Sequence, residues 1–283
     1  MNLAPQSAPG SQASDQDGPN SAISGVDEKA RILIAGGCHV TGYPFGERDS
    51  FSSKLGEMFR SSGSSVGIRT QGLINLRSSA NVIACAEDFR PDILILQLAN
   101  YETTPGVRAF IMRRFGAKYR AGSSSSATDV SPLDSAFSRT KWRVKAYSKS
   151  LADTLTRHSL IDTPCVSALV ESFLSSVSSM GLSSVLVMSP LPCMDPVINS
   201  YRRDLCPLFR DLSARFGFSY IDIFDVLDNG ATPRRHFYHD GIHLTRAGHD
   251  AVAQAIFAEL RAQSLQMRSP GRSCPLQRRQ SKC

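Results

Sequence analysis

The sequence predicts an α/β protein in which a parallel sheet is covered by helices on both faces. Two observations carry this prediction. Short apolar segments rich in β-branched residues alternate along the chain with amphipathic segments of helical spacing. One of the apolar segments, 92–98 (DILILQL), is apolar almost throughout, which is typical of a parallel strand that is buried on both faces. The chain has 283 residues, 41% of them hydrophobic, and is long enough for such a domain.

The expected strands are short and end at turn-forming residues. The first one, 31–35 (RILIA), runs into Gly36 and Gly37, and paired glycines permit a tight turn. The other expected strands are 65–70, 92–98, 184–189 and 218–223.

The expected helices fill the intervals between the strands. Phe51, Leu55, Met58 and Phe59 recur at the spacing of one helix face, which predicts a helix over 51–61. The other expected helices are 81–89, 141–158, 164–180, 199–216 and 245–262.

The two ends of the chain differ from its body in composition. Residues 1–28 are rich in Ser, Gly, Pro, Gln and Asp, and residues 264–283 have a similar composition with basic residues added. Neither segment has enough apolar surface to offset the entropy lost on ordering, so we expect both to be disordered. The sequence therefore predicts one folded domain at 29–263.

Membrane and export signals are not evident. No apolar run is long enough to span a bilayer, and the N-terminus has neither the basic nor the apolar region of a secretory signal peptide. The seven cysteines are irregularly spaced without a CxxC pair, so no disulfide framework is expected. We expect a cytoplasmic protein without a transmembrane segment.

The net charge of +7 is unevenly distributed. Residues 261–283 carry six basic residues and no acid, whereas residues 1–28 carry four acids and no lysine or arginine. The body between them is only mildly basic, and a mildly basic body with a basic tail argues against a specific nucleic-acid-binding face.

Candidate functional residues follow the expected strands, because ligand sites in such sheets lie at the carboxyl ends of the strands. Cys38 comes directly after the glycine pair, and we expect it near the start of a helix, where backbone N–H groups favour a thiolate. Asn100 follows the third strand and can donate its amide to an oxyanion, and Gly72 follows the second strand. A buried inert cysteine and a turn-forming asparagine are the alternatives.

The segment before the last expected helix carries the strongest pattern. Asp240 and His243 are separated by a glycine and an isoleucine, and a loop of this shape can direct both side chains into one pocket. The carboxylate then orients and stabilises the imidazole, as general-base catalysis requires. A helix cap at the surface is the alternative.

A metal site is a rival interpretation of the same segment. His236, His239, Asp240, His243 and His249 lie close together in the sequence, and imidazole clusters bind zinc and related metals. Neither an HExxH motif nor the spacing of a zinc finger is present.

These positions, in this order, resemble the SGNH hydrolase superfamily, also called GDSL-type esterases. The first family block is matched by 32–44 (ILIAGGCHVTGYP), and the glycine of the second block by Gly72. Asn100 matches the asparagine of the third block, and 240–243 (DGIH) matches the Asp-x-x-His of the last block. The resemblance covers about residues 30–262.

The resemblance implies a three-layer α/β/α (flavodoxin-like) domain with a five-stranded parallel sheet. It also implies acyl chemistry on a small-molecule or glycan ester or thioester, by hydrolysis or transfer and without a cofactor. In the implied triad, Cys38 attacks the carbonyl, His243 takes and returns the proton, and Asp240 orients His243. The implied oxyanion hole consists of the N–H groups of Cys38 and Gly72 and the side chain of Asn100.

The sequence departs from the family pattern at the site itself. Cys38 stands where the family has the nucleophilic serine, and Gly37 stands where it has an aspartate. In the third block, Leu98 and Tyr101 replace a glycine and an aspartate. Because a thiol ionises far more readily than an alcohol, a Cys–His pair remains chemically coherent.

Three functions stay open from the sequence. They are a cysteine-dependent acyl hydrolase or acyltransferase, a catalytically inactive member of the fold that serves as a binding module, and a metal-dependent enzyme. Arg234 and Arg235 precede the last block and are candidates for binding an anionic substrate, with solvated surface arginines as the alternative.

Overall fold

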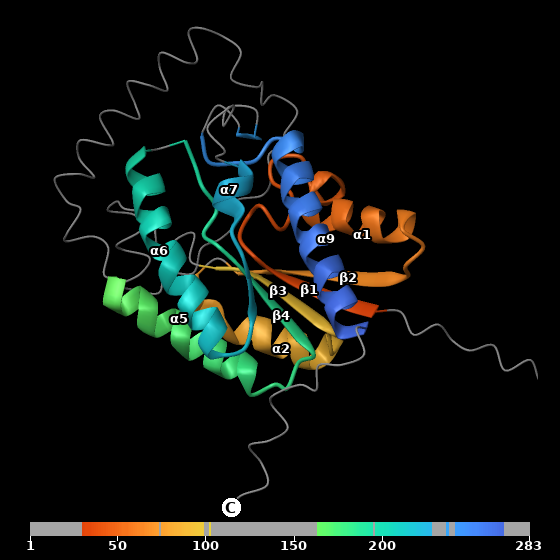
Figure 1. Ribbon diagram of the computed structural model, residues 1–283. Coiled ribbons are helices and arrows are strands. Elements are labelled where there is room, and N and C mark those ends of the chain that lie inside the picture. Colours follow the sequence, from red (N-terminus) through yellow and green to blue (C-terminus); the bar gives the residue numbers. More distant parts are fainter. Residues whose placement is uncertain are drawn as a thin grey trace, which may run out of the picture.

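The computed structural model describes residues 30–73, 75–98, 102, 163–194, 196–227, 236–237 and 241–268 (Figure 1). The expected helix at 141–158 lies outside the described residues, as does the N-terminal segment 1–28.

Five parallel strands form a single sheet in the order β2-β1-β3-β4-β5. This result confirms the predicted α/β class and the five-stranded parallel sheet. Each of the five strands overlaps an expected one. The strands are β1 (Ala30–Gly36), β2 (Val66–Gly72), β3 (Ile93–Gln97), β4 (Ser184–Met188) and β5 (Ser219–Ile221).

The helices follow the predicted order, with differences at their ends. Helix α1 has the predicted bounds, whereas α9 continues past its predicted end at Ala262. The helix α7 and the two short 3-10 helices were not predicted, because a single turn shows no helical periodicity. The described helices are η1 (Glu47–Asp49), α1 (Phe51–Ser61), η2 (Leu76–Ser78), α2 (Ala80–Phe89), α5 (Thr163–Ser178), α6 (Pro196–Arg215), α7 (Ile223–Leu227) and α9 (Arg246–Arg268). None of the helices in the described part of the chain combines the length and apolar character needed to cross a bilayer.

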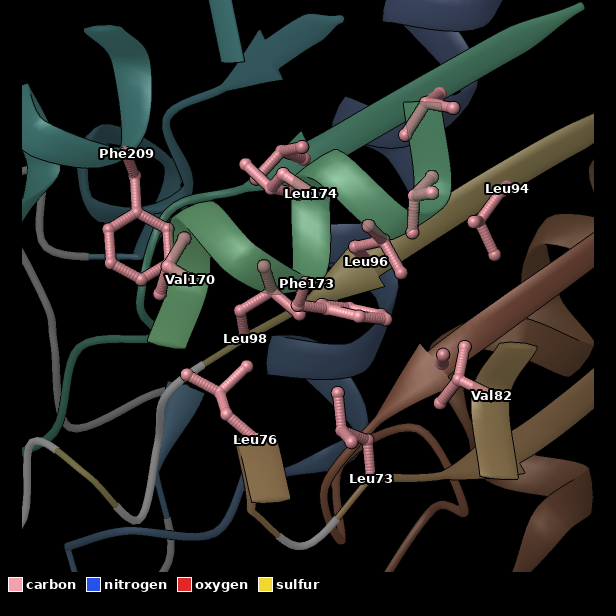
Figure 2. Close-up of a cluster of buried hydrophobic side chains, with 14 of the residues drawn as sticks. Leu73, Leu76, Val82, Leu94, Leu96, Leu98, Val170, Phe173, Leu174 and Phe209 are labelled. Atoms are coloured by element: carbon pink, nitrogen blue, oxygen red, sulfur yellow. The ribbon is translucent and has the colours of Figure 1, made fainter. Parts of the chain in front are cut away.

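Alternate residues of the central strands enter opposite cores. In β1, Ile32 and Ile34 pack in one core with residues of α1, α7 and α9, whereas Leu33 and Ala35 pack in the other with residues of α2, α5 and α6. Figure 1 shows α1 and α9 on one side of the sheet and α2, α5 and α6 on the other. Figure 2 shows the second core, in which apolar side chains of β3 and α5 meet. The sheet is therefore covered by helices on both faces, as its apolar strands require.

The carboxyl end of β1 is the point where the chain connections diverge. The helix that follows β1, α1, covers one face of the sheet, and the helix that follows β2, α2, covers the other. β1 lies between β2 and β3, so its carboxyl end has the topology at which ligands bind in open α/β sheets.

The segment after β1 corrects one prediction. Residues 38–45 form consecutive turns, and the first α-helix begins only at Phe51, so Cys38 does not lie at the start of a helix. Gly42 adopts a φ of 77°, and a Cβ at this position would collide with the Gly46 carbonyl oxygen. This backbone conformation is not helical, and it is one that only glycine adopts without strain. The N-terminus of an α-helix therefore does not stabilise a Cys38 thiolate.

Candidate active site

Cys38 occupies the first turn after β1, with its thiol half-buried. The turn is closed by the amide of Tyr43, which donates to the carbonyl of Cys38 at 3.0 Å, and by the hydroxyl of Thr41, which donates to the same carbonyl at 2.9 Å. The Cys38 Sγ lies 3.8 Å from Nδ1 of His39 and also hydrogen-bonds the His243 side chain. The thiol therefore contacts two imidazoles.

His39 is a buried residue that the sequence analysis did not single out. Its Nε2 lies 3.0 Å from the carbonyl oxygen of Ile242, and its Nδ1 lies 3.3 Å from the amide nitrogen of Gln97. A carbonyl oxygen only accepts, so Nε2 carries a proton and donates it to Ile242. The nitrogen that faces the thiol is Nδ1.

His243 comes from the loop before α9, as the sequence analysis expected, and is half-buried. Its ring centroid lies 5.8 Å from that of His39 and 4.5 Å from that of Tyr43. The loop is anchored by a 2.7 Å hydrogen bond from the Met194 amide to the Gly241 carbonyl. Cys38 and His243 are two of the three predicted triad residues. The structure brings them into contact although they lie far apart in the sequence.

The surroundings of Cys38 shift the pKa of its thiol in opposite directions. Burial of the thiol, the largest single influence, raises the pKa. The positive charge of His39 and the hydrogen bonds from His243 and His39 lower it, and together they outweigh burial. The pKa of Cys38 is held well below its ordinary value, which favours the thiolate.

Solved structures with similar folds were found, although no protein-family model and no curated protein matches the sequence. One is a lipase/acylhydrolase from Enterococcus faecalis, with a TM-score of 0.53 and 11% identity over 83% of this chain and 96% of that chain. Another, described as a lipolytic protein of the G-D-S-L family from Desulfitobacterium hafniense, has a TM-score of 0.52 and 9% identity over 81% and 99% of the two chains. The family 3 carbohydrate esterase of Clostridium thermocellum has a TM-score of 0.52 and 13% identity over 83% and 99%. The chain shares the fold of these three proteins.

Gly72 ends β2 beside the end of β1, where it pairs with Gly36. A Cβ added to Gly72 would meet no atom within 4 Å, so the space around this residue is open at the same edge as Cys38. The position is compatible with the oxyanion-hole role that the resemblance implies for Gly72, and that role stays a prediction.

Several predicted site residues lie outside the described residues. They are Asn100, Arg234, Arg235, His239 and Asp240. Their roles in the oxyanion hole, in substrate binding, in a metal site and in the triad stay predictions.

Two histidines of the predicted metal cluster have other contacts. Nδ1 of the buried His249 accepts the backbone N–H of Phe51 at 3.2 Å, and Nδ1 of His236 lies 3.1 Å from the Leu227 carbonyl oxygen. Within the described ranges, no group of three His, Cys, Asp or Glu side chains is placed to hold a metal ion. The metal hypothesis therefore gains no support from the described residues.

Proposed function

We propose that this protein is an acyl hydrolase or acyltransferase that acts on an ester or thioester through Cys38. The observation that carries the proposal is the contact of the Cys38 thiol with His39 and His243 at the carboxyl edge of the sheet. A thiolate stabilised by imidazoles is the form in which cysteine attacks carbonyl carbon. The esterase and acylhydrolase descriptions of the structural neighbours support the same reaction class.

The proposed reaction proceeds in two steps. The Cys38 thiolate adds to the acyl carbon and expels the alcohol or thiol, which leaves an acyl-enzyme thioester. Water or a second acceptor then attacks the thioester, and His243 carries the proton to the leaving group and from the attacking nucleophile. Asp240 orients His243, and the N–H groups of Cys38 and Gly72 with the Asn100 amide stabilise the oxyanion, as the resemblance implies.

Replacement of the family's serine by cysteine is compatible with activity at this site. An alcohol needs a strong base because its pKa lies far above that of imidazole, whereas a thiol has a pKa near about 8.5. The Cys38 thiol has two imidazoles in contact and a lowered pKa. A binding module has no physical need of this arrangement.

The test combines turnover with detection of the intermediate. The protein is incubated with p-nitrophenyl acetate, longer acyl esters and acyl-coenzyme A thioesters, and product release is measured beside intact-protein mass. We expect an acyl adduct that maps to Cys38 and that is absent, with turnover, from Cys38→Ala. The matched control is Cys85→Ala, which removes a half-buried thiol on α2 outside the site and should retain activity. Full turnover in Cys38→Ala would contradict the proposal, and binding without turnover of any ester would favour the binding module.

A further inference from the structure

The two imidazoles at Cys38 differ in their surroundings. His39 is buried, and both of its ring nitrogens lie within hydrogen-bonding reach of protein groups. His243 is half-buried and stands beside Tyr43, the ring of which is 42% exposed. The first imidazole is therefore enclosed by protein, whereas the second lies close to solvent.

We propose that His39 is a second catalytic histidine, which holds the proton of the Cys38 thiol on Nδ1 while His243 exchanges protons with the leaving group and water. This assignment rests on the function proposed above and divides between two histidines the work that one histidine does in a simple triad.

Nδ1 is the only nitrogen of His39 that can accept the thiol proton. Nε2 already carries a proton, because it lies 3.0 Å from the Ile242 carbonyl oxygen, which cannot donate. Nδ1 faces the Cys38 Sγ at 3.8 Å, which is within hydrogen-bond range for sulfur. Transfer of the thiol proton to Nδ1 therefore needs no rotation of the ring.

The buried amide of Gln97 can adapt to a charged His39. With the Gln97 amide nitrogen facing Nδ1 at 3.3 Å, its Oε1 is buried without a hydrogen-bond partner among the described residues. A buried oxygen without a partner costs free energy. A half-turn of the amide brings Oε1 to Nδ1–H of an imidazolium, and the amide N–H groups then take the former place of Oε1. Gln97 can therefore accept a hydrogen bond from a protonated His39 as well as donate one to a neutral His39.

Gly36 keeps Gln97 in this position. A Cβ at residue 36 would approach the Gln97 Oε1 to 2.6 Å and its Cβ to 2.7 Å, so only glycine leaves room for the amide. The Gln97 side chain therefore packs directly over the end of β1, next to the turn that carries Cys38 and His39.

The other titratable groups around Cys38 and His39 do not offset the positive charge of His39. On the α9 side is His249, the pKa of which is lowered to about 3 by burial and by the charges of His39, Lys54 and His243, so it is neutral. Lys54 of α1 is paired with Asp250. From the loop before α9, His243 faces the thiol directly. Within the described residues, the thiolate itself is the group that balances the charge of His39.

With the two histidines in these roles, each proton of the reaction has a donor and an acceptor. In the free enzyme the S–H bond of Cys38 is broken and an N–H bond is formed on His39. His243 takes up a second proton from solvent. The thiolate attacks the acyl carbon, the bond to the leaving group breaks, and His243 gives that group its proton. In the second step neutral His243 takes a proton from water, the hydroxide adds to the thioester carbon, and the thiolate leaves to re-form its pair with His39.

The test measures the ionisation of Cys38 separately from acyl turnover. The rate of Cys38 alkylation by iodoacetamide is followed against pH in the wild type, His39→Gln and His243→Gln. Glutamine at position 39 keeps an N–H for the Ile242 carbonyl and removes the group that faces the thiol. We expect His39→Gln to raise the midpoint by about one pH unit or more, with about tenfold slower alkylation near pH 6. In His243→Gln we expect a smaller shift, with turnover reduced about 100-fold.

A second measurement on the unmutated site guards against misfolding of His39→Gln. Nitrogen-15 spectra of the histidine rings should contain an imidazolium signal near pH 7 that disappears in Cys38→Ala. An unshifted alkylation midpoint in folded His39→Gln, or no such signal, would overturn the role of His39 while an acyl adduct on Cys38 still supported the proposed function. Absence of the adduct at any pH would instead overturn the proposed function.

Discussion

The location of Cys38 disfavours the thiolate that its proposed role requires. The thiol is half-buried, and burial alone raises a thiol pKa and suppresses the reactive thiolate. His39 and His243 reverse this effect over short distances, and no helix N-terminus contributes. The chemistry of the site is thus determined by three side chains, two of them adjacent in sequence.

The exchange of sulfur for oxygen tests how closely the site depends on a thiolate. We expect Cys38→Ser to lose at least about 100-fold in kcat/KM, because imidazole ionises an alcohol poorly and Gly37 supplies no carboxylate beside it. The variant should unfold at nearly the same temperature as the wild type. The measurement is kcat/KM on one ester with Tm in parallel, and a serine variant of undiminished kcat/KM would show that the site does not depend on thiolate chemistry.

Glycine at position 36 gives a second prediction at this scale. Gly36→Ala places a Cβ against Gln97 and Val40, so both side chains must move. We expect the midpoint of Cys38 alkylation to rise toward that of His39→Gln, because the amide no longer supports the imidazolium. Gly56→Ala on α1 is the matched control, since the nearest atom to an added Cβ there is the Ile68 Cδ1, at 3.3 Å. Equal alkylation profiles in the wild type and Gly36→Ala would contradict the role assigned to Gln97.

The sequence indicated part of this site and missed another part. Cys38 and His243 follow a strand and precede a helix in motifs that a family resemblance makes visible. His39 and Gln97 were not predicted, because the sequence does not reveal that the side chain of the residue after Cys38 lies against the Cys38 thiol. Their signal was present only as a histidine after Cys38 and a polar residue in an apolar strand.

At the scale of elements, a hydrogen bond between α1 and α9 helps to hold the segments around the site together. The first backbone N–H of α1 donates to Nδ1 of His249 on α9, and the Ser50 side chain accepts from Ser53 at 3.1 Å. A histidine buried on α9 thus supplements the N-terminal cap of a helix far away in sequence. This contact holds α9, and with it the end of the His243 loop, against the segment that follows β1.

The burial of His249 makes the fold sensitive to acid. Its pKa of about 3 lies below the ordinary 6.5, so the unfolded chain binds a proton that the folded chain does not. The stabilisation is complete above pH 6.5 and is lost progressively as the pH falls from 6.5 toward 3. We expect a loss of up to about 1.4 kcal/mol per pH unit from this residue.

Urea unfolding at about pH 7 and pH 5 measures this effect. The control is His249→Gln, in which an amide oxygen can accept the same N–H but does not titrate. Its free energy of unfolding should fall less between the two pH values than that of the wild type. Identical losses in the two proteins would show that His249 does not carry the acid sensitivity.

The elements themselves were largely predictable from local patterns. The apolar run of β3 and the spacing of Phe51, Leu55 and Met58 in α1 record burial directly, so sequence and structure agree there. The turns at 38–45 were not predicted, because their form depends on glycines with positive φ and on packing against distant segments. The short α7 was missed because it lacks a full period.

On the scale of the whole molecule, two cores depend on one sheet. Leu96 is fully buried on the side of α2, α5 and α6, whereas Ile95 next to it is fully buried on the side of α1 and α9. The central strands therefore contribute to both cores at once, and a defect in either core is transmitted to the strand ends that carry the site.

Truncation of a central side chain should be costly. We expect Leu96→Ala to lower the free energy of unfolding by about 2–5 kcal/mol, because the cavity in a two-sided core cannot collapse. Glu57→Ala, at an exposed position of α1, should change it by no more than about 0.5 kcal/mol. Chemical unfolding of both variants checks this, and similar losses in the two would contradict the packing described.

The hydrogen bond from His39 to the Ile242 carbonyl joins the turn after β1 to the loop before α9. The two residues are 203 positions apart in the sequence. This hydrogen bond orients the His39 imidazole only when the loop that contains Ile242 has folded. A chain still being synthesised therefore carries an ordinary thiol, which peroxide oxidises slowly. On the proposed function, a reactive Cys38 therefore arises only in the finished fold, and the incomplete chain is less exposed to oxidation at this sulfur.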